Sequence, residues 1–179
     1  MVARTESETA FARLYEEYGG RVLAYCVRRL PRDDARDAAA EVFAVAWRKF
    51  DDVPRDEGAI RWLYGVARNV VKNHRRSRRR SDNLVTKLVS LRGDGGPGPE
   101  AHVIERDEHK VVREAIQRLR PKYREVLQLV EWEGLSRNDA ADVLHLSRAA
   151  IDQRMHRAYL QLEQDLSAAS TTQTERGGA

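Results

Sequence analysis

The chain has 179 residues, 41% hydrophobic and 34% charged, which suits one medium domain or two small ones and excludes a fibrous or collagen-like protein. Its net charge of +4 permits a polyanionic partner, and its single cysteine, Cys26, excludes an intramolecular disulfide or a cysteine-based metal cage. Because no apolar run is long enough to cross a bilayer and the N-terminus lacks the layout of a secretion signal, we expect a cytoplasmic protein without a membrane partner.

Apolar residues recur at helical spacing along most of the chain, which predicts an all-α fold. A first helix is expected from a capping box that starts at Thr5 until Pro31. A second helix is expected within residues 32–50, where three aspartates in the first turn suit the positive end of the helix dipole. Residues 61–80 supply a third helix, and another helix with three shorter ones should follow before Leu166.

Glycine and proline cluster between two helical parts of the chain, at residues 93–99. This composition is typical of a flexible connector, and the small polar residues at the C-terminus are typical of disorder. We therefore predict two small helical domains joined by a linker. The predicted ranges are 1–80 for the first domain, 81–101 for the flexible linker, 102–168 for the second domain and 169–179 for a disordered tail.

The helix expected at 61–80 carries eight Lys or Arg and no acid. Its residues, placed at 100° intervals, form an apolar inward side and an outward side of cations, amides and Trp62. Cations neutralise phosphates, amides hydrogen-bond base edges, and an aromatic ring stacks on an unpaired base for about 1–3 kcal/mol. The outward side therefore suits DNA that is being opened; alternatively, Trp62 belongs to the core and the arginines form a solvated face. The inward residues are Ile60, Leu63, Ala67, Val70, Val71 and His74, and the outward residues are Arg61, Trp62, Arg68, Asn69, Lys72, Asn73, Arg75, Arg76 and Arg79.

Residues 134–162 have the layout of a helix-turn-helix. Ser136 can cap a short first helix, with an acid three residues later, and Ser147 can cap the second helix. His145 stands where many such turns have glycine, and histidine tolerates left-handed backbone better than most residues. The second helix could lie in a major groove with its cations on phosphates, although the pattern also fits a plain helical hairpin in a bundle. Its inward residues are Ile151, Met155, Ala158 and Tyr159, and its outward residues are Arg148, Ala149, Asp152, Gln153, His156 and Arg157.

Three segments follow one another along the chain: "DARDAAAEVFAVAWRKF", "WLYGVARNVVKNHRRSRRR" and "AIQRLRPKYREVLQLVEWEGLSRNDAADVLHLSRAAIDQRMHRAYLQL". Their succession resembles the extracytoplasmic-function class of bacterial RNA polymerase sigma factors. The resemblance implies an alternative sigma factor that binds core RNA polymerase and directs promoter recognition, DNA melting and transcription initiation, without catalytic residues or cofactors of its own. The implied partners are the clamp helices of the largest polymerase subunit, the flap of the second-largest subunit, promoter DNA and an anti-sigma factor.

The resemblance implies a polymerase-binding role for the second helix, whose acidic and aromatic pattern matches the family's clamp-docking motif. The residues at these positions are Asp37, Glu41, Phe43 and Trp47, with Arg48 beside them. We expect Phe43 and Trp47 to hold the domain core because they lie on the inward stripe, while the charged residues make the outer contact. Ala40 stands where the family usually has glutamine, which puts one polar contact in doubt.

The resemblance also implies how the first domain meets the minus-ten promoter element. Residues 52–59 match the loop that captures a flipped base, and Asp56 and Glu57 are candidate acceptors for its exocyclic amines. The outward side of the helix at 61–80 matches the surface that reads and melts this element. The implied minus-ten residues are Asp56, Glu57, Arg61, Trp62, Arg68, Asn69, Lys72, Asn73, Arg75 and Arg76.

The helix-turn-helix resembles the family's region that reads the minus-thirty-five element. Asp152 stands where the family usually has lysine and would repel phosphate, and Arg148 is our candidate to supply the missing positive charge. These departures imply an altered sequence preference. The implied minus-thirty-five residues are Ser147, Arg148, Ala149, Asp152, Gln153, Arg154, His156 and Arg157.

Two other classes of protein remain open, a stand-alone helix-turn-helix regulator whose N-terminal helices dimerise and an enzyme. A dimer seam would favour a continuous heptad repeat, whereas the second helix carries clustered acids beside its aromatic stripe. An enzyme would need chemistry that the motifs do not supply, since no phosphate loop or nucleophile elbow is present. We expect no metal, although His102 and His109 beside Glu105 and Glu108 could form a weak site. The histidines are His74, His102, His109, His145 and His156.

Overall fold

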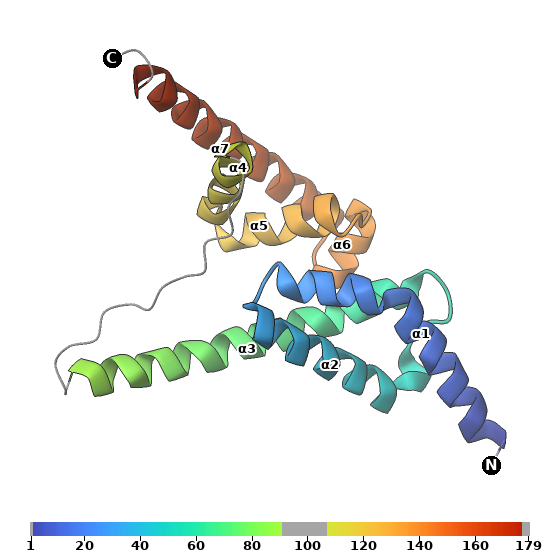
Figure 1. The fold of residues 1–179 in the computed structure, drawn as a ribbon. Coiled ribbons are helices and arrows are strands. Elements are labelled where there is room, and N and C mark those ends of the chain that lie inside the picture. Colours follow the sequence, from blue (N-terminus) through green and yellow to red (C-terminus); the bar gives the residue numbers. More distant parts are fainter. Residues whose placement is uncertain (1, 91–106, 177–179) are drawn as a thin grey trace. The chain divides into compact units, whose positions relative to one another are not determined.

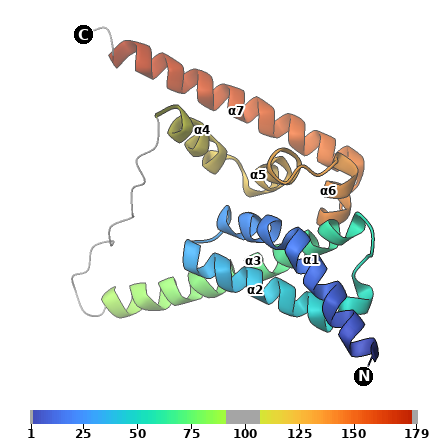
Figure 2. The ribbon, with the colours of Figure 1, turned by 45° about the vertical axis from the view of Figure 1, so that its right-hand side comes forward.

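The computed structural model describes the backbone of residues 2–90 and 107–176, and the side chains of residues 6–81 and 111–168. All regular secondary structure within these ranges is helical, which confirms the predicted all-α fold. The chain divides between Pro97 and Gly98 into two compact units. Figures 1 and 2 show the helices of each unit from two directions.

Three long helices and one short 3-10 turn make up the first unit, and each long helix packs against the other two. The helix α2 starts after Pro31, as the sequence predicts, with two of the three expected aspartates, Asp33 and Asp34, in its first turn. The long helix α3 extends past α1 and α2 (Figure 1). The elements are α1 (Val2–Val27), α2 (Arg32–Arg48), η1 (Phe50–Asp52) and α3 (Gly58–Ser90).

Small and aromatic side chains fill the core of the first unit. Ala38 of α2 and Ala67 of α3 are fully buried, which allows the helices to approach closely. Tyr25 of α1 stacks on Tyr64 of α3 with the ring centroids 5.2 Å apart. Each large side chain that leaves water stabilises the fold by about 1.5–3 kcal/mol, so this core fixes which side of α3 faces out. Among the described residues of α3, the buried apolar side chains are Ala59, Ile60, Leu63, Tyr64, Ala67, Val70 and Val71.

An aromatic cluster lies where α1 meets the end of α2. The Phe11 ring centroid is 5.0 Å from that of Trp47 and 5.7 Å from that of Phe50. Phe43 is buried as expected, but the prediction that Trp47 holds the core is wrong, because 43% of Trp47 is exposed. Helical periodicity places Trp47 toward α1, yet Phe11 and Phe50 cover only part of its ring. Trp47 therefore lies at the rim of the core.

Two predicted limits of the first unit need correction. The helix α1 begins at Val2, so Thr5 lies inside the helix and is not its N-cap. The helix α3 runs on to Ser90, through the first part of the predicted linker. Residues 81–90 include leucines and lack glycine and proline, so nothing in their composition ends the helix. The rest of the predicted linker falls in residues 91–106, outside the described backbone.

The second unit is built around the long helix α7, against which α4, α5 and α6 pack (Figures 1 and 2). Its largest fully buried side chains include Leu119, Leu129, Ile151 and Met155. The elements are α4 (Asp107–Arg118), α5 (Pro121–Leu127), the π-helical η2 (Gln128–Trp132), α6 (Arg137–Leu144) and α7 (Arg148–Arg176).

Two predictions for α7 are wrong. Tyr159 was expected to face inward, but it is 45% exposed and its hydroxyl donates to Glu131 Oε1 at 2.6 Å. The polar end of a tyrosine favours such an acceptor at the surface over an apolar core. The tail predicted to be disordered from residue 169 is helical as far as Arg176. No glycine or proline occurs in α7 before Gly177, so the helix continues.

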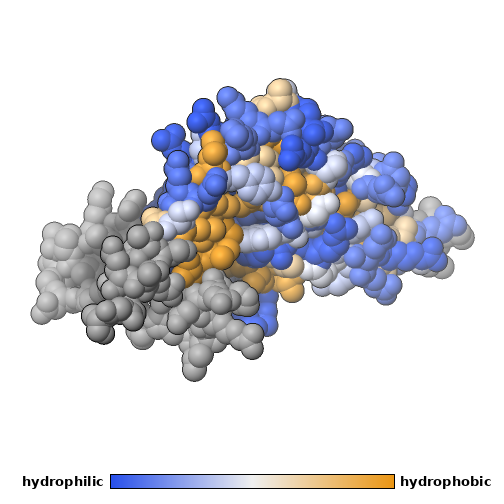
Figure 3. Space-filling model, turned by 90° about the horizontal axis from the view of Figure 1, so that it is seen from above, coloured by the Kyte–Doolittle hydropathy of each residue, from blue (hydrophilic) through white to orange (hydrophobic). Residues whose placement is uncertain are grey.

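Charged and polar side chains dominate the surface seen in Figure 3, and apolar side chains gather in a band between them. Within the part of the chain that the structure describes, no helix combines the length and the apolar character needed to span a membrane.

Candidate nucleic-acid interface

The outward side of α3 is largely exposed, as the sequence predicts. Asn69, Lys72, Asn73 and Arg76 are exposed along it. Trp62, Arg61 and Arg68 are half-buried. The tryptophan is therefore neither a fully buried core residue nor a fully exposed ring that is free to stack on a base. The accessible part of this side therefore presents amides and cations along α3, with a partly exposed Trp62 near its start.

Some polar residues of α3 bind acceptors in the first unit itself. Arg75 Nε and Nη2 donate to the carbonyl of Arg29, in the turn between α1 and α2, at 3.2 and 2.9 Å. A hydrogen bond from a charged donor contributes about 1.5–3 kcal/mol when its partner is shielded from water. Arg75 was predicted to contact DNA, and in this structure it attaches α3 to the α1–α2 turn. The sequence gives no signal of this contact, because donor and acceptor are 46 positions apart.

His74 connects α3 with the helix that is predicted to bind polymerase. It was expected to face inward, but it is half-buried, and its Nε2 lies 3.1 Å from Glu41 Oε2 on α2. One turn further along α3, Arg78 Nη1 donates to Asp34 Oδ2 at 3.2 Å. Exposed pairs of this kind contribute roughly 0–1 kcal/mol each, so they align α2 and α3 more than they stabilise the unit.

The predicted base-capture loop leads directly into α3. Asp56 Oδ1 accepts a hydrogen bond from the backbone N–H of Gly58 at 2.8 Å, and the Asp56 carbonyl accepts from Ala59 at 3.0 Å. These bonds satisfy backbone donors at the start of α3, which a helix otherwise leaves without partners. One carboxylate oxygen of Asp56 is therefore occupied by the helix start. Glu57 is exposed.

The exposed side of α2 carries the charged residues that are predicted to bind polymerase. Asp37, Glu41 and Arg48 are exposed, while Phe43 is buried beneath them. The exposed charges and the buried Phe43 match the expectation, whereas the exposed Trp47 does not. The role of these side chains in binding stays a prediction.

The turn and caps of the helix-turn-helix are confirmed. Ser136 is the N-cap of α6, and its Oγ accepts from the backbone N–H of Asp139 at 3.1 Å. His145 ends α6 in the left-handed conformation, with φ 52° and ψ 50°. Ser147 Oγ accepts from the backbone N–H of Ala150 at 3.2 Å, which caps α7. The predicted recognition helix therefore starts at a defined place and angle relative to α6.

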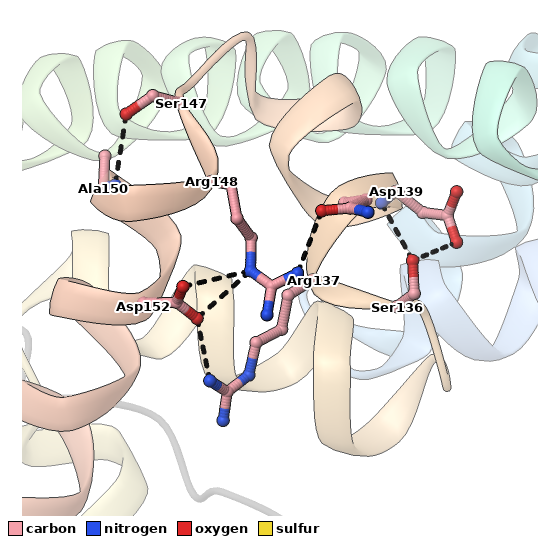
Figure 4. Close-up of polar contacts among 8 residues, drawn as sticks. Ser136, Arg137, Asp139, Ser147, Arg148, Ala150 and Asp152 are labelled. Atoms are coloured by element: carbon pink, nitrogen blue, oxygen red, sulfur yellow. Dashed lines mark hydrogen bonds and ion pairs between the residues drawn. The ribbon is translucent and has the colours of Figure 1, made fainter.

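Asp152 of α7 joins two arginines, as Figure 4 shows. Arg148 Nε donates to both of its carboxylate oxygens at 3.1 and 3.2 Å, and Arg137 Nη1 donates to Oδ1 at 2.7 Å. Arg148 also donates to Asn138 Oδ1 at 2.9 Å. The hydrogen bonds from Arg137 and then Arg148 hold the pKa of Asp152 below its ordinary value, so the carboxylate is ionised at neutral pH.

The network around Asp152 changes the interpretation of that residue. The sequence predicts an acid that repels phosphate, but its charge is compensated by two guanidinium groups, which leaves a net positive cluster. Arg137 was not among the predicted site residues. It lies on α6, and the sequence could not predict its contact with Asp152, because that contact depends on the starts of α6 and α7 lying side by side.

The predicted minus-thirty-five residues differ in how far they reach into solvent. Ser147, Arg148, Ala149, Gln153, His156 and Arg157 are exposed, whereas Asp152 and Arg154 are half-buried. Since α7 buries Ile151, Met155 and Ala158 on its opposite side, the exposed set forms one continuous surface. Such a surface at the start of a capped helix suits insertion into a major groove.

Among the described residues, no group of three or more His, Cys, Asp or Glu is placed to hold a metal ion. The weak site considered at His102 and His109 lies outside the described side chains.

Two family models match the chain. The model described as Sigma-70 region 2 matches residues 14–81, and the model described as Sigma-70, region 4 matches residues 109–162. The RNA polymerase sigma factor CnrH of Cupriavidus metallidurans is 32% identical over 94% of this chain and 92% of its own length. The ECF RNA polymerase sigma factor BldN of Streptomyces coelicolor is 31% identical over 87% of this chain and 60% of its own length.

Solved structures are similar to this one as well. The structure of CnrH in complex with the cytosolic domain of CnrY has a TM-score of 0.63 at 26% identity, with 90% of both chains covered. The structure of the sigma factor RpoE with the anti-sigma factor NepR from Bartonella quintana has a TM-score of 0.66, with 88% of this chain and 96% of that chain covered. At 22% identity, the second likeness concerns the fold alone.

Proposed function

Because the chain belongs to the extracytoplasmic-function sigma factors of bacterial RNA polymerase, we propose that its first unit docks on polymerase and opens the minus-ten element while its second unit reads the minus-thirty-five element. Sigma factors bind core RNA polymerase and promoter DNA and are non-catalytic initiation factors. The chain is thus an alternative sigma factor, and the stand-alone regulator is not favoured.

One observation carries the proposed division of labour. Residues 61–80 of α3, which carry cations and amides but no acid, belong to one unit, and a capped helix-turn-helix belongs to a separate unit. Promoter recognition by a sigma factor requires contacts with two elements a set distance apart, which two units on one chain can supply. The proposed domains keep the predicted order, with the first ending on α3 and the second containing α4 to α7.

The polymerase contact is proposed on α2. Asp37, Glu41 and Arg48 would meet the clamp helices of the largest subunit, while Phe43 and Trp47 support α2 from below and at its rim. The exposed charges and the half-exposed indole suit an interface with a polar rim and an aromatic anchor. The second unit would add a contact with the flap of the second-largest subunit.

An anti-sigma partner is also part of the proposal. The similar structure of CnrH contains the cytosolic domain of CnrY, and that of RpoE contains the anti-sigma factor NepR. In this chain, α1 exposes Tyr15, Leu23 and Val27, which are apolar side chains that a partner could cover. We also propose that the chain acts in the cytoplasm, where bacterial polymerase transcribes, and that it has no enzymatic activity.

The first test is capture of core RNA polymerase by the purified full chain at moderate salt. Replacing Asp37 and Glu41 by alanine should weaken capture about tenfold or more, equivalent to about 1.4 kcal/mol. The matched control removes two acids outside α2, Glu16 and Asp51, and should capture polymerase like the wild type. If well-folded wild-type chain captures no polymerase, the proposed function is wrong.

A further inference from the structure

A basic groove runs along one side of α7 in the second unit. It has a volume of about 820 Å³ and lies between α7 and the residues at the start of α5. Its lining residues on α7 extend from Ala150 to Asp165, which corresponds to about 22 Å of helix at about 1.5 Å per residue. The groove is therefore long enough for a polymer and not only for a small ion.

The charge of the groove is strongly positive. Its cations are Arg120, Lys122, Arg154 and Arg157. Among the residues that the structure describes, none of these four forms an ion pair. Asp165 also lines the groove, but its Oδ2 lies 3.7 Å from Arg118 Nε, outside the lining, so its charge is already compensated.

Four cations against one acid leave the groove with a net positive charge, and a polyanion would relieve the repulsion among the cations. The groove is continuous with the surface that is proposed to read DNA, since Gln153 and Arg157 belong to both. A major groove is only about 12 Å wide, so a helix that enters it by its first turns must pass a phosphate strand with its later turns. The α5–α7 groove starts at the first turn of α7 and continues beside those later turns.

We infer that the α5–α7 groove seats the phosphate strand that borders the minus-thirty-five site, and that Arg120 and Lys122 are DNA-contacting residues. This inference rests on the proposed function. Arg120 and Lys122 lie more than twenty residues before α7 in the sequence and showed no helix-turn-helix signal. Their contacts would position the recognition helix without reading bases.

The test measures how the affinity of the holoenzyme for DNA depends on salt. The probes are a duplex selected by the wild-type holoenzyme from a random-sequence pool, the same duplex with its sequence scrambled, and a single-stranded RNA of equal length. Each lost phosphate contact lowers the slope of log affinity against log salt by about 1, so replacing Arg120 and Lys122 by glutamine should lower it by about 2. The selected and scrambled duplexes should lose affinity by the same factor.

The control variant replaces Arg113 and Arg124 by glutamine, which removes the same net charge from the same unit outside the groove. It should keep the wild-type slope. The inference is overturned if the groove variant keeps the wild-type slope, or if the control variant loses as much slope as the groove variant. It is also overturned if the groove variant loses affinity for the selected duplex alone, or for the RNA and not for the duplex.

The failure of this inference can be told apart from failure of the proposed function. If the wild-type holoenzyme selects no duplex, the proposed function fails and the groove has no promoter strand to hold. If it selects one and the groove variant behaves as wild type, the groove inference alone fails. Circular dichroism checks that each variant is folded. If the double variant is not folded, Arg120 and Lys122 are replaced by alanine one at a time, and each single variant should lower the slope by about 1.

Discussion

The two helices that are proposed to contact DNA, α3 in the first unit and α7 in the second, use their arginines differently. On α3, Arg75 and Arg78 donate to acceptors in and beside the turn between α1 and α2. On α7, Arg148 binds Asp152 one turn away, and the same carboxylate binds Arg137 of α6. The α3 contacts attach a helix to its domain, whereas the α7 contacts orient cations at an exposed surface. The number of arginines on a helix is therefore not the number of its phosphate contacts.

The largest expected effect is a difference in stability between variants of two neighbouring arginines of α3, Arg75 and Arg76. Replacing Arg75 by alanine should lower the unfolding free energy of the first unit by about 1.5–3 kcal/mol, because two charge-assisted hydrogen bonds to the Arg29 carbonyl are lost. Replacing the exposed Arg76 by alanine should change that free energy by less than about 0.5 kcal/mol. The unfolding free energies of both variants can be measured by denaturant titration, with hydrogen exchange of the α3 amides as the probe of the first unit.

The DNA affinity of the same two variants sharpens the comparison. The Arg76→Ala variant should bind single-stranded minus-ten DNA more weakly and with a smaller salt slope, since it loses the proposed phosphate contact without loss of a contact that supports the fold. If Arg75→Ala leaves the stability of the first unit unchanged and weakens DNA binding instead, α3 uses its arginines as α7 does, and the comparison fails.

The second prediction concerns the acid on α7. Replacing Asp152 by asparagine should raise affinity for scrambled duplex about fivefold, equivalent to about 1 kcal/mol, because the guanidinium groups of Arg137 and Arg148 are released to phosphates. The preference for the selected duplex over the scrambled one should fall, since the freed arginines are no longer held in one orientation. Fluorescence anisotropy at several salt concentrations measures both quantities.

Glu163→Gln is the matched control for Asp152, because it removes the same charge from an exposed position of the same helix. Its effect should be smaller than that of Asp152→Asn. Equal gains for the two variants would mean that net charge alone is responsible, and that Asp152 does not position the arginines.

Features that depend on neighbours in the sequence were predictable. The caps at Ser136 and Ser147 and the left-handed His145 each involve partners within about one helical turn, so spacing alone identifies them. The inward side of α3 was equally clear, because Leu63 and Val70 recur at helical spacing. These local signals were enough to predict two helical units and the order of their motifs.

Features that depend on which helices become neighbours were not predictable. His74 meets Glu41 across 33 positions, and Arg137 meets Asp152 across 15, and no periodicity carries that information. Periodicity also assigned Trp47 inward without revealing that too little of the chain covers it. The same holds for Arg120 and Lys122, which join the groove through tertiary packing.

The smallest expected effect tests the turn between α6 and α7. His145 has a φ of 52°, a conformation that costs a residue with a Cβ about 1 kcal/mol relative to glycine. Replacing it by glycine should therefore stabilise the second unit by roughly 0.5 kcal/mol, since part of the gain is lost to the greater entropy of the unfolded chain. Replacing it by alanine should destabilise the unit instead. Thermal unfolding of the three chains gives this order, and a destabilised glycine variant would mean that the His145 side chain, not its backbone, holds the recognition helix in place.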